Sequence, residues 1–110
     1  MSQGIFLLMI DKATALESVL RKLKKLPVGH CIDLRTYKRN RSLLILHHID
    51  EEFTIFEDGY EVLEHKTTLK TVRKLLKNLF KREFPRSNKI RMYDLGEFNE
   101  TMREREMKKL

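Results

Sequence analysis

Basic side chains recur at helical spacing in the second half of the chain, in a pattern typical of a surface that binds phosphates. Because successive helical residues advance by about 100°, five of them fall within one third of the circumference of a helix predicted over residues 68–83. They are Lys70, Arg73, Lys74, Lys77 and Lys81. Like charges at i,i+4 each cost a helix about 0.2–0.5 kcal/mol, a cost that a bound polyanion would offset.

A second basic group, predicted on the turn between two strands, consists of Lys38, Arg39 and Arg41. Charge is unevenly distributed along the chain as a whole. Residues 66–91 contain ten basic residues and one acid, whereas residues 50–64 contain seven acids and neither lysine nor arginine. The sequence therefore predicts a non-catalytic protein that binds the phosphates of DNA or RNA through these two basic groups.

The acidic segment supports a different interpretation. The basic helix of one subunit could bind the acidic hairpin of another, or of a protein partner, in a protein-interaction or self-assembly module. The acidic hairpin could also screen the basic helix within a single chain. The sequence leaves these alternatives open.

A third hypothesis is metal-dependent hydrolysis. Asp58 and the tripeptide Glu64-His65-Lys66 combine carboxylate oxygens, which suit Mg²⁺, with a lysine that can assist an attacking water. The order of elements, a helix, three or four strands, a basic helix and a further strand, resembles the core of the PD-(D/E)xK nucleases. That resemblance implies a further acid on the first helix, for which Glu17 is the candidate. The proline that usually precedes the first acid is absent.

Other motifs for catalysis or metal binding are absent from the sequence. There is no Gly-rich phosphate loop, no serine elbow and no Cys–His pair at the spacing of a nucleophile and its base. The adjacent His47 and His48 point to opposite faces of a predicted strand, so they cannot hold one ion together. Cys31 is interpreted as a small apolar residue. We therefore expect no catalytic residue, no metal ion and no cofactor.

Hydrophobic periodicity predicts the elements that position these residues. The apolar run over residues 5–10 indicates a strand ahead of a helix over residues 12–25, with Asp11 as its N-cap; one helix over 5–25 is the alternative. From Gly29 the period changes to two, which predicts strands over 30–37, 43–49, 53–57, 60–64 and 89–95.

Two local signals refine these predictions. Asp58-Gly59 predicts a two-residue hairpin turn that places Ile55 opposite Val62, with Tyr60 on the same face. Thr67 or Thr68 is the expected cap of the second helix, and Pro85 its end. In residues 97–109, helix formers carry an apolar edge of Phe98, Met102 and Met107, and whether this segment is ordered stays open.

The predicted fold is one small basic α+β domain over residues 1–110. It consists of an antiparallel sheet of four to six strands, two main helices packed on one face, and a short C-terminal helix. The expected core is Leu16, Leu20, Leu23, Ile32, Leu34, Leu44, Leu46, Val72, Leu75, Leu76 and Leu79.

Composition narrows the class of protein. Among the 110 residues, 41% are hydrophobic, enough for a core, and the net charge is +7. The single cysteine excludes a disulfide-stapled scaffold, and the longest apolar run, six residues, is far shorter than the roughly 20 that cross a bilayer. We therefore expect a cytoplasmic protein without a membrane partner. Abundant Lys, Arg and Glu with few Gln and Cys is also typical of organisms that grow at high temperature.

Overall fold

The computed structural model describes residues 6–36, 38 and 40–102, and it confirms the predicted α+β fold with six strands and two main helices. In chain order these elements are β1 (Phe6–Asp11), α1 (Lys12–Lys25), β2 (His30–Arg35), β3 (Ser42–Ile49), β4 (Glu52–Asp58), β5 (Val62–Thr68), α2 (Val72–Glu83) and β6 (Lys89–Glu97). A short C-terminal helix begins at Glu100. In the described part of the chain, no helix is long and apolar enough to cross a membrane.

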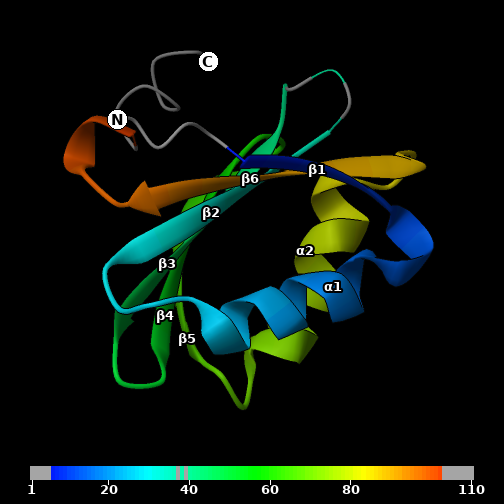
Figure 1. Ribbon diagram of the computed structural model, residues 1–110. Coiled ribbons are helices and arrows are strands. Elements are labelled where there is room, and N and C mark those ends of the chain that lie inside the picture. The colour runs from blue at the N-terminus through cyan, green and yellow to red at the C-terminus, as the bar shows by residue number, and fades with distance from the viewer. Residues whose placement is uncertain (1–5, 37, 39, 103–110) are drawn as a thin grey trace.

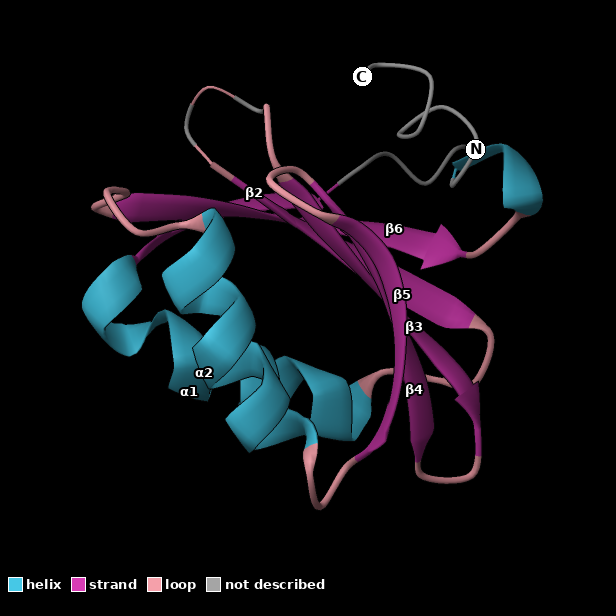
Figure 2. Cartoon of the chain, turned by 180° about the vertical axis from the view of Figure 1, so that it is seen from behind, coloured by secondary structure: helices cyan, strands magenta, loops and turns pink. Residues whose placement is uncertain are grey.

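The six strands form one antiparallel sheet in the order β1-β6-β2-β3-β4-β5. The last strand, β6, therefore lies between the first two and joins the two ends of the fold. Figure 1 shows that the sheet is strongly twisted, and that α1 and α2 lie side by side against one of its faces. Seen from behind in Figure 2, the sheet curves around the two helices.

The start of the fold settles the alternative at residues 5–25 in favour of a strand followed by a helix. β1 pairs with β6, and α1 begins at Lys12, as predicted. Asp11 stands at the N-cap position but makes no side-chain cap hydrogen bond. Its carboxylate lies instead 2.5 Å from Nζ of Lys89, because the register of β1 and β6 places these two residues opposite each other.

The core lies between the helices and the sheet, and one part of the predicted core is wrong. Ile32 is opposite Ile45 and Leu34 is opposite Leu43, and residues directly opposite share a face. The strand therefore contributes Leu43 and Ile45 to the core cluster, and not Leu44 and Leu46. A run of consecutive apolar residues does not show which alternate set faces the helices. Leu44 is nevertheless buried, on the outer face of the sheet.

The segment after β6 packs on this outer face. The ring of Phe98 stacks on that of Phe56, with centroids 5.9 Å apart, and Sδ of Met102 lies 3.7 Å from Sγ of Cys31. Burial, and to a smaller extent Asp33 and Asp94, raise the pKa of Cys31 to about 12. Phe98 and Met102 therefore contact the sheet of their own chain, whereas Met107 lies outside the described residues.

The predicted two-residue turn between β4 and β5 is wrong. Asp58 is opposite Val62, so the loop has three residues, and Ile55 is opposite His65. The side chain of Tyr60 is 70% exposed and does not share the core face with Ile55. The physical reason lies in α2, because the carboxylate of Glu83 accepts hydrogen bonds from the backbone N–H groups of Tyr60 and Glu61, at 2.7 and 3.1 Å.

This contact also explains why a glycine stands at position 59, for a reason other than the predicted turn. Positive φ occurs at Gly29 and Gly96 among the described glycines, and not at Gly59. A Cβ atom on Gly59 would instead collide with Oε1 of Glu83. Glycine is therefore required at this position for space, because a buried carboxylate approaches the backbone.

The second helix begins later than predicted. Thr67 and Thr68 belong to β5, where Thr68 is opposite Glu52, so neither caps the helix. α2 begins at Val72, and Thr71 stands at its N-cap position. Pairing with β4 extends the strand into residues that the sequence assigned to the helix. Lys70 consequently lies just ahead of α2 and not on it.

Candidate nucleic-acid interface

Four exposed lysines follow the outer side of α2. Lys74, Lys77 and Lys81 are on the helix and Lys70 lies just before it. None of the four makes a hydrogen bond or ion pair with another residue in the part of the chain that the structure describes. At about 1.5 Å per residue, the three lysines on the helix extend over roughly 10 Å, and Lys70 precedes them. We call these four residues the lysine row.

The opposite side of α2 fixes the helix in place. Val72, Leu76 and Leu79 are buried in the core, so the helix presents the lysine row outward at a defined orientation. The predicted set of basic helix residues thus shares one exposed side of α2, except for Lys70, which precedes the helix. Its arginine, however, differs from its lysines.

Arg73 is paired with a carboxylate of α1. Its guanidinium donates two hydrogen bonds to Glu17, at 2.6 and 3.1 Å. The hydrogen bond with Arg73 lowers the pKa of Glu17 against a smaller opposing effect of burial, and the charges of Arg73, Arg21 and Lys24 lower it further. The basic surface therefore continues from α2 onto α1 through Arg21 and Lys24, with Glu17 as an acid within it.

Arg82, near the end of α2, is also paired. It donates two hydrogen bonds, at 2.8 and 2.7 Å, to Glu57 of β4, and Nε2 of His65 lies 2.8 Å from the same carboxylate. Although burial alone would raise the pKa of Glu57, hydrogen bonds with Arg82, Glu83 and His65 lower it to about 2. Burial and the neighbouring Glu57 raise the pKa of Glu83. Of the two buried carboxyls, Glu57 is therefore the one that ionises more readily.

The turn between β2 and β3 carries basic residues, and one of them also binds the end of α2. Arg41 donates hydrogen bonds to the backbone carbonyls of Arg82 and Glu83, at 3.3 and 3.1 Å, and so satisfies carbonyl groups that a helix end leaves unpaired. Lys38 is exposed on the same turn. Arg39 was predicted with them but lies outside the described residues.

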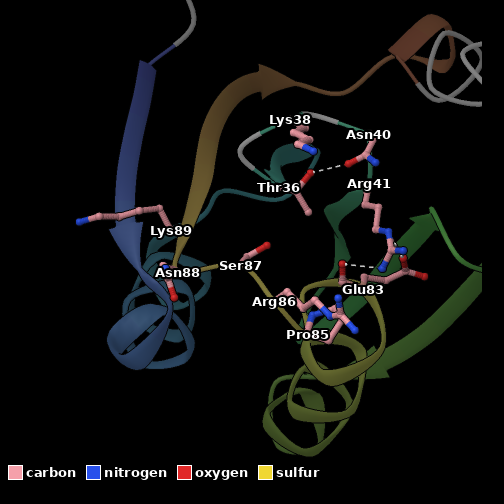
Figure 3. A pocket seen from close by; sticks show the side chains of 10 residues that line it. All are labelled: Thr36, Lys38, Asn40, Arg41, Glu83, Pro85, Arg86, Ser87, Asn88 and Lys89. Carbon is pink, nitrogen blue, oxygen red and sulfur yellow. Dashed lines mark hydrogen bonds and ion pairs between the residues drawn. The ribbon is translucent and has the colours of Figure 1, made fainter.

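Beside this turn is a cleft that the sequence analysis missed. It has a volume of about 730 Å³ and lies between the β2–β3 turn and the connection from α2 to β6 (Figure 3). Lys38 and Arg41 line one side, and Arg86, Ser87 and Asn88 line the other. These segments are more than 40 residues apart, and no sequence spacing relates them. They are brought together by the pairing of β2 with β6, which places Arg35 opposite Arg91, and by the hydrogen bonds of Arg41 to the end of α2.

The acids suggested by the nuclease resemblance do not converge. Asp58 and Glu64 lie on the outer face of the sheet, because they share the face of Phe56 in the register of β4 and β5. Glu17 is on α1, on the other side of the sheet. Within residues 6–36, 38 and 40–102 no group of three or more His, Cys, Asp or Glu side chains is placed to hold a metal ion.

The geometry thus separates the predicted basic residues into three kinds. The lysine row is exposed without partners among the described residues, Arg73 is paired with Glu17, and Lys38 and Arg41 line the cleft. Comparison of the chain with protein-family models, curated proteins and solved structures found no match. The chemistry of these surfaces is therefore the basis on which a function can be assigned.

Proposed function

We propose that the protein binds nucleic acid, with the lysine row against the phosphate backbone. The observation that carries this proposal is the contrast between the arginines of α2 and the four lysines of the row. Arg73 and Arg82 are paired with carboxylates of the same chain, whereas the four lysines have no partner in the described part of the chain. A row of ammonium groups that extends over roughly 10 Å along the helix alone suits a polymer that carries one phosphate about every 3.4 Å along each strand.

The surroundings of the lysine row support the same proposal. Arg21 and Lys24 extend the positive surface onto α1, where their charges act on Glu17. Lysine contacts to phosphates position a protein on nucleic acid and carry no sequence information. We therefore expect binding that depends on charge and varies little with base sequence.

Self-association through the acidic hairpin has less support. Glu57, near the centre of that hairpin, is already paired with Arg82 of the same chain, and its side chain is fully buried. Part of the negative charge of the hairpin is therefore already neutralised within the fold. A salt-sensitive oligomer remains the observation that would favour this second function.

Binding of labelled nucleic acid tests the proposal. Fluorescence anisotropy is measured with duplex DNA of about 20 base pairs and with single-stranded RNA, at about 50 mM salt. The double variant Lys70→Gln with Lys77→Gln removes two charges from the row. We expect the Kd for at least one ligand to rise about tenfold or more.

The matched control removes two charges elsewhere, through Lys25→Gln on α1 and Lys66→Gln on β5. Both control lysines are exposed, so neither double variant is expected to change thermal unfolding. A Kd for the control within about twofold of the wild type supports the lysine row. Equal losses in the two double variants would show that only net charge matters, and would refute a defined interface.

A further inference from the structure

The cleft between the β2–β3 turn and the α2–β6 connection is lined by groups that suit an anion. Its volume of about 730 Å³ lies within the range of roughly 300–1,000 Å³ that is usual for small-molecule sites. In Figure 3 the side chain of Ser87 points into the space between the two segments, and Lys38 and Arg86 lie on opposite sides of it. Lys89 points away, toward β1, where it pairs with Asp11.

The uncharged polar groups of the cleft can donate hydrogen bonds to an anion. Oδ1 of Asn40 accepts a hydrogen bond from Oγ1 of Thr36 at 2.8 Å. The amide N–H groups of Asn40 can still donate hydrogen bonds to a ligand. Ser87 and Asn88 supply a hydroxyl and a second amide. Each of these groups can donate a hydrogen bond to an oxygen of a bound anion.

The charges of the cleft are also favourable to an anion. Lys38 and Arg86 have no hydrogen-bond or ion-pair partner among the residues that the structure describes. Arg41 lies 3.9 Å from the carboxylate of Glu83 and so balances the charge of that acid, and it covers the carbonyl groups at the end of α2 that would otherwise repel an anion. The one acid in the lining, Glu83, directs its carboxylate to the backbone N–H groups of Tyr60 and Glu61.

We propose that this cleft binds the terminal phosphate monoester of a nucleotide-sized ligand, with Arg86 and Lys38 on the phosphate oxygens and Ser87 and Asn88 as hydrogen-bond donors. A monoester carries a charge of about −1.5 to −2 at pH 7, more than one backbone phosphodiester, and so matches two unpaired cations. The guanidinium of Arg86 can bind two phosphate oxygens at once. The site is separate from the lysine row and does not depend on the proposed function.

Such a phosphate has two sources, a free nucleoside monophosphate and the phosphorylated end of a nucleic-acid strand. The first arm of the test uses adenosine 5′-monophosphate, with adenosine as the matched ligand that lacks the phosphate. The ¹⁵N-labelled full chain is titrated at constant ionic strength and followed by NMR. We expect saturable shifts of the backbone amides of Ser87 and Asn88 with the monophosphate, with a Kd below about 1 mM, and none with adenosine.

Two variants in the cleft and one outside it locate the site. Arg86→Ala and Lys38→Ala each remove a cation that has no described partner, so the fold is expected to be retained. We expect each to raise the Kd for the monophosphate, by about tenfold for Arg86→Ala, because it removes a charge-assisted bidentate contact. Lys66→Ala, on β5, loses the same charge and is expected to leave the Kd unchanged.

The second arm compares one oligonucleotide with a 5′-phosphate or a 5′-hydroxyl. A preference for the phosphorylated strand that disappears in Arg86→Ala assigns the cleft to strand ends. Binding of the monophosphate without such a preference assigns it to free nucleotides. The proposal is overturned if monophosphate and adenosine shift the same amides equally, if neither ligand binds and the strands do not differ, or if both cleft variants bind like the wild type. None of these outcomes depends on the lysine row.

Discussion

At the scale of single residues, the buried Glu83 connects more parts of the fold than any residue of the lysine row. Its carboxylate binds the β4–β5 turn, lies against Glu57, and borders the cleft. The sequence predicted the exposed lysines of α2, because the spacing of Lys74, Lys77 and Lys81 on one helix is a local property. It gave no sign of Glu83, which stands as one acid in a basic segment and acts on a turn 23 residues earlier.

Glu83→Ala is expected to lower the free energy of unfolding by about 3 kcal/mol, since it removes two charge-assisted hydrogen bonds from a buried carboxylate to the β4–β5 turn. Gly59→Ala is expected to lower it by about 1–3 kcal/mol, because the new Cβ displaces the Glu83 carboxylate. Urea unfolding of both single variants and the double variant measures their coupling. In the absence of the Glu83 side chain, Gly59→Ala should cost clearly less. Additive losses would contradict the close approach seen here.

The buried carboxyl pair also predicts a dependence on pH. The pKa of Glu57 is lowered from its ordinary value of 4.5 to about 2, so its contribution to stability is present above pH 4.5 and is lost as the pH falls toward 2. We expect the free energy of unfolding to fall less between pH 4.5 and 2.5 in Glu57→Gln than in the wild type. Equal slopes for the two proteins would show that Glu57 is not held in its ionised form.

At the scale of elements, the hydrophobic pattern predicted both ends of α1 and the presence of all six strands, although the run over residues 5–10 also fitted a helix. The predicted boundaries of these elements were wrong where tertiary contacts outweigh local preference. Asp58-Gly59 favours a tight turn in isolation, but Glu83 holds a three-residue loop. Thr67 and Thr68 resemble helix caps, but pairing with β4 keeps them in β5. The face of β3 could not be predicted, because Leu43, Leu44, Ile45 and Leu46 do not alternate with polar residues.

The contact between α1 and α2 predicts a variant that binds more tightly. Glu17→Gln removes the carboxylate that pairs with Arg73, which frees a guanidinium beside the lysine row. Because the pair is exposed, thermal unfolding should barely change. We expect the Kd for duplex DNA at about 50 mM salt to fall by roughly two- to fivefold. The matched control is Glu64→Gln on β5, which removes an exposed carboxylate paired with Lys66 on the outer face of the sheet, away from α2. An equal fall of the Kd in both variants would contradict the role assigned to Arg73.

At the scale of the whole molecule, the fold class could be predicted, but the order of strands could not. β6 inserts between β1 and β2, an arrangement that depends on contacts between the two ends of the chain. This insertion places the α2–β6 connection beside the β2–β3 turn and so forms the cleft. The exposed lysines could therefore be predicted from the sequence, whereas the cleft depends on the order of the strands and could not.

The salt dependence of duplex DNA binding is the most direct test of the lysine row. If all four lysines contact phosphates, log Kd should rise with log salt concentration with a slope of about 3.6. Lys70→Gln with Lys77→Gln should lower that slope by about 1.8, while the control Lys25→Gln with Lys66→Gln leaves it unchanged. The account is contradicted if the wild type binds no nucleic acid at about 50 mM salt, or if the three slopes are the same.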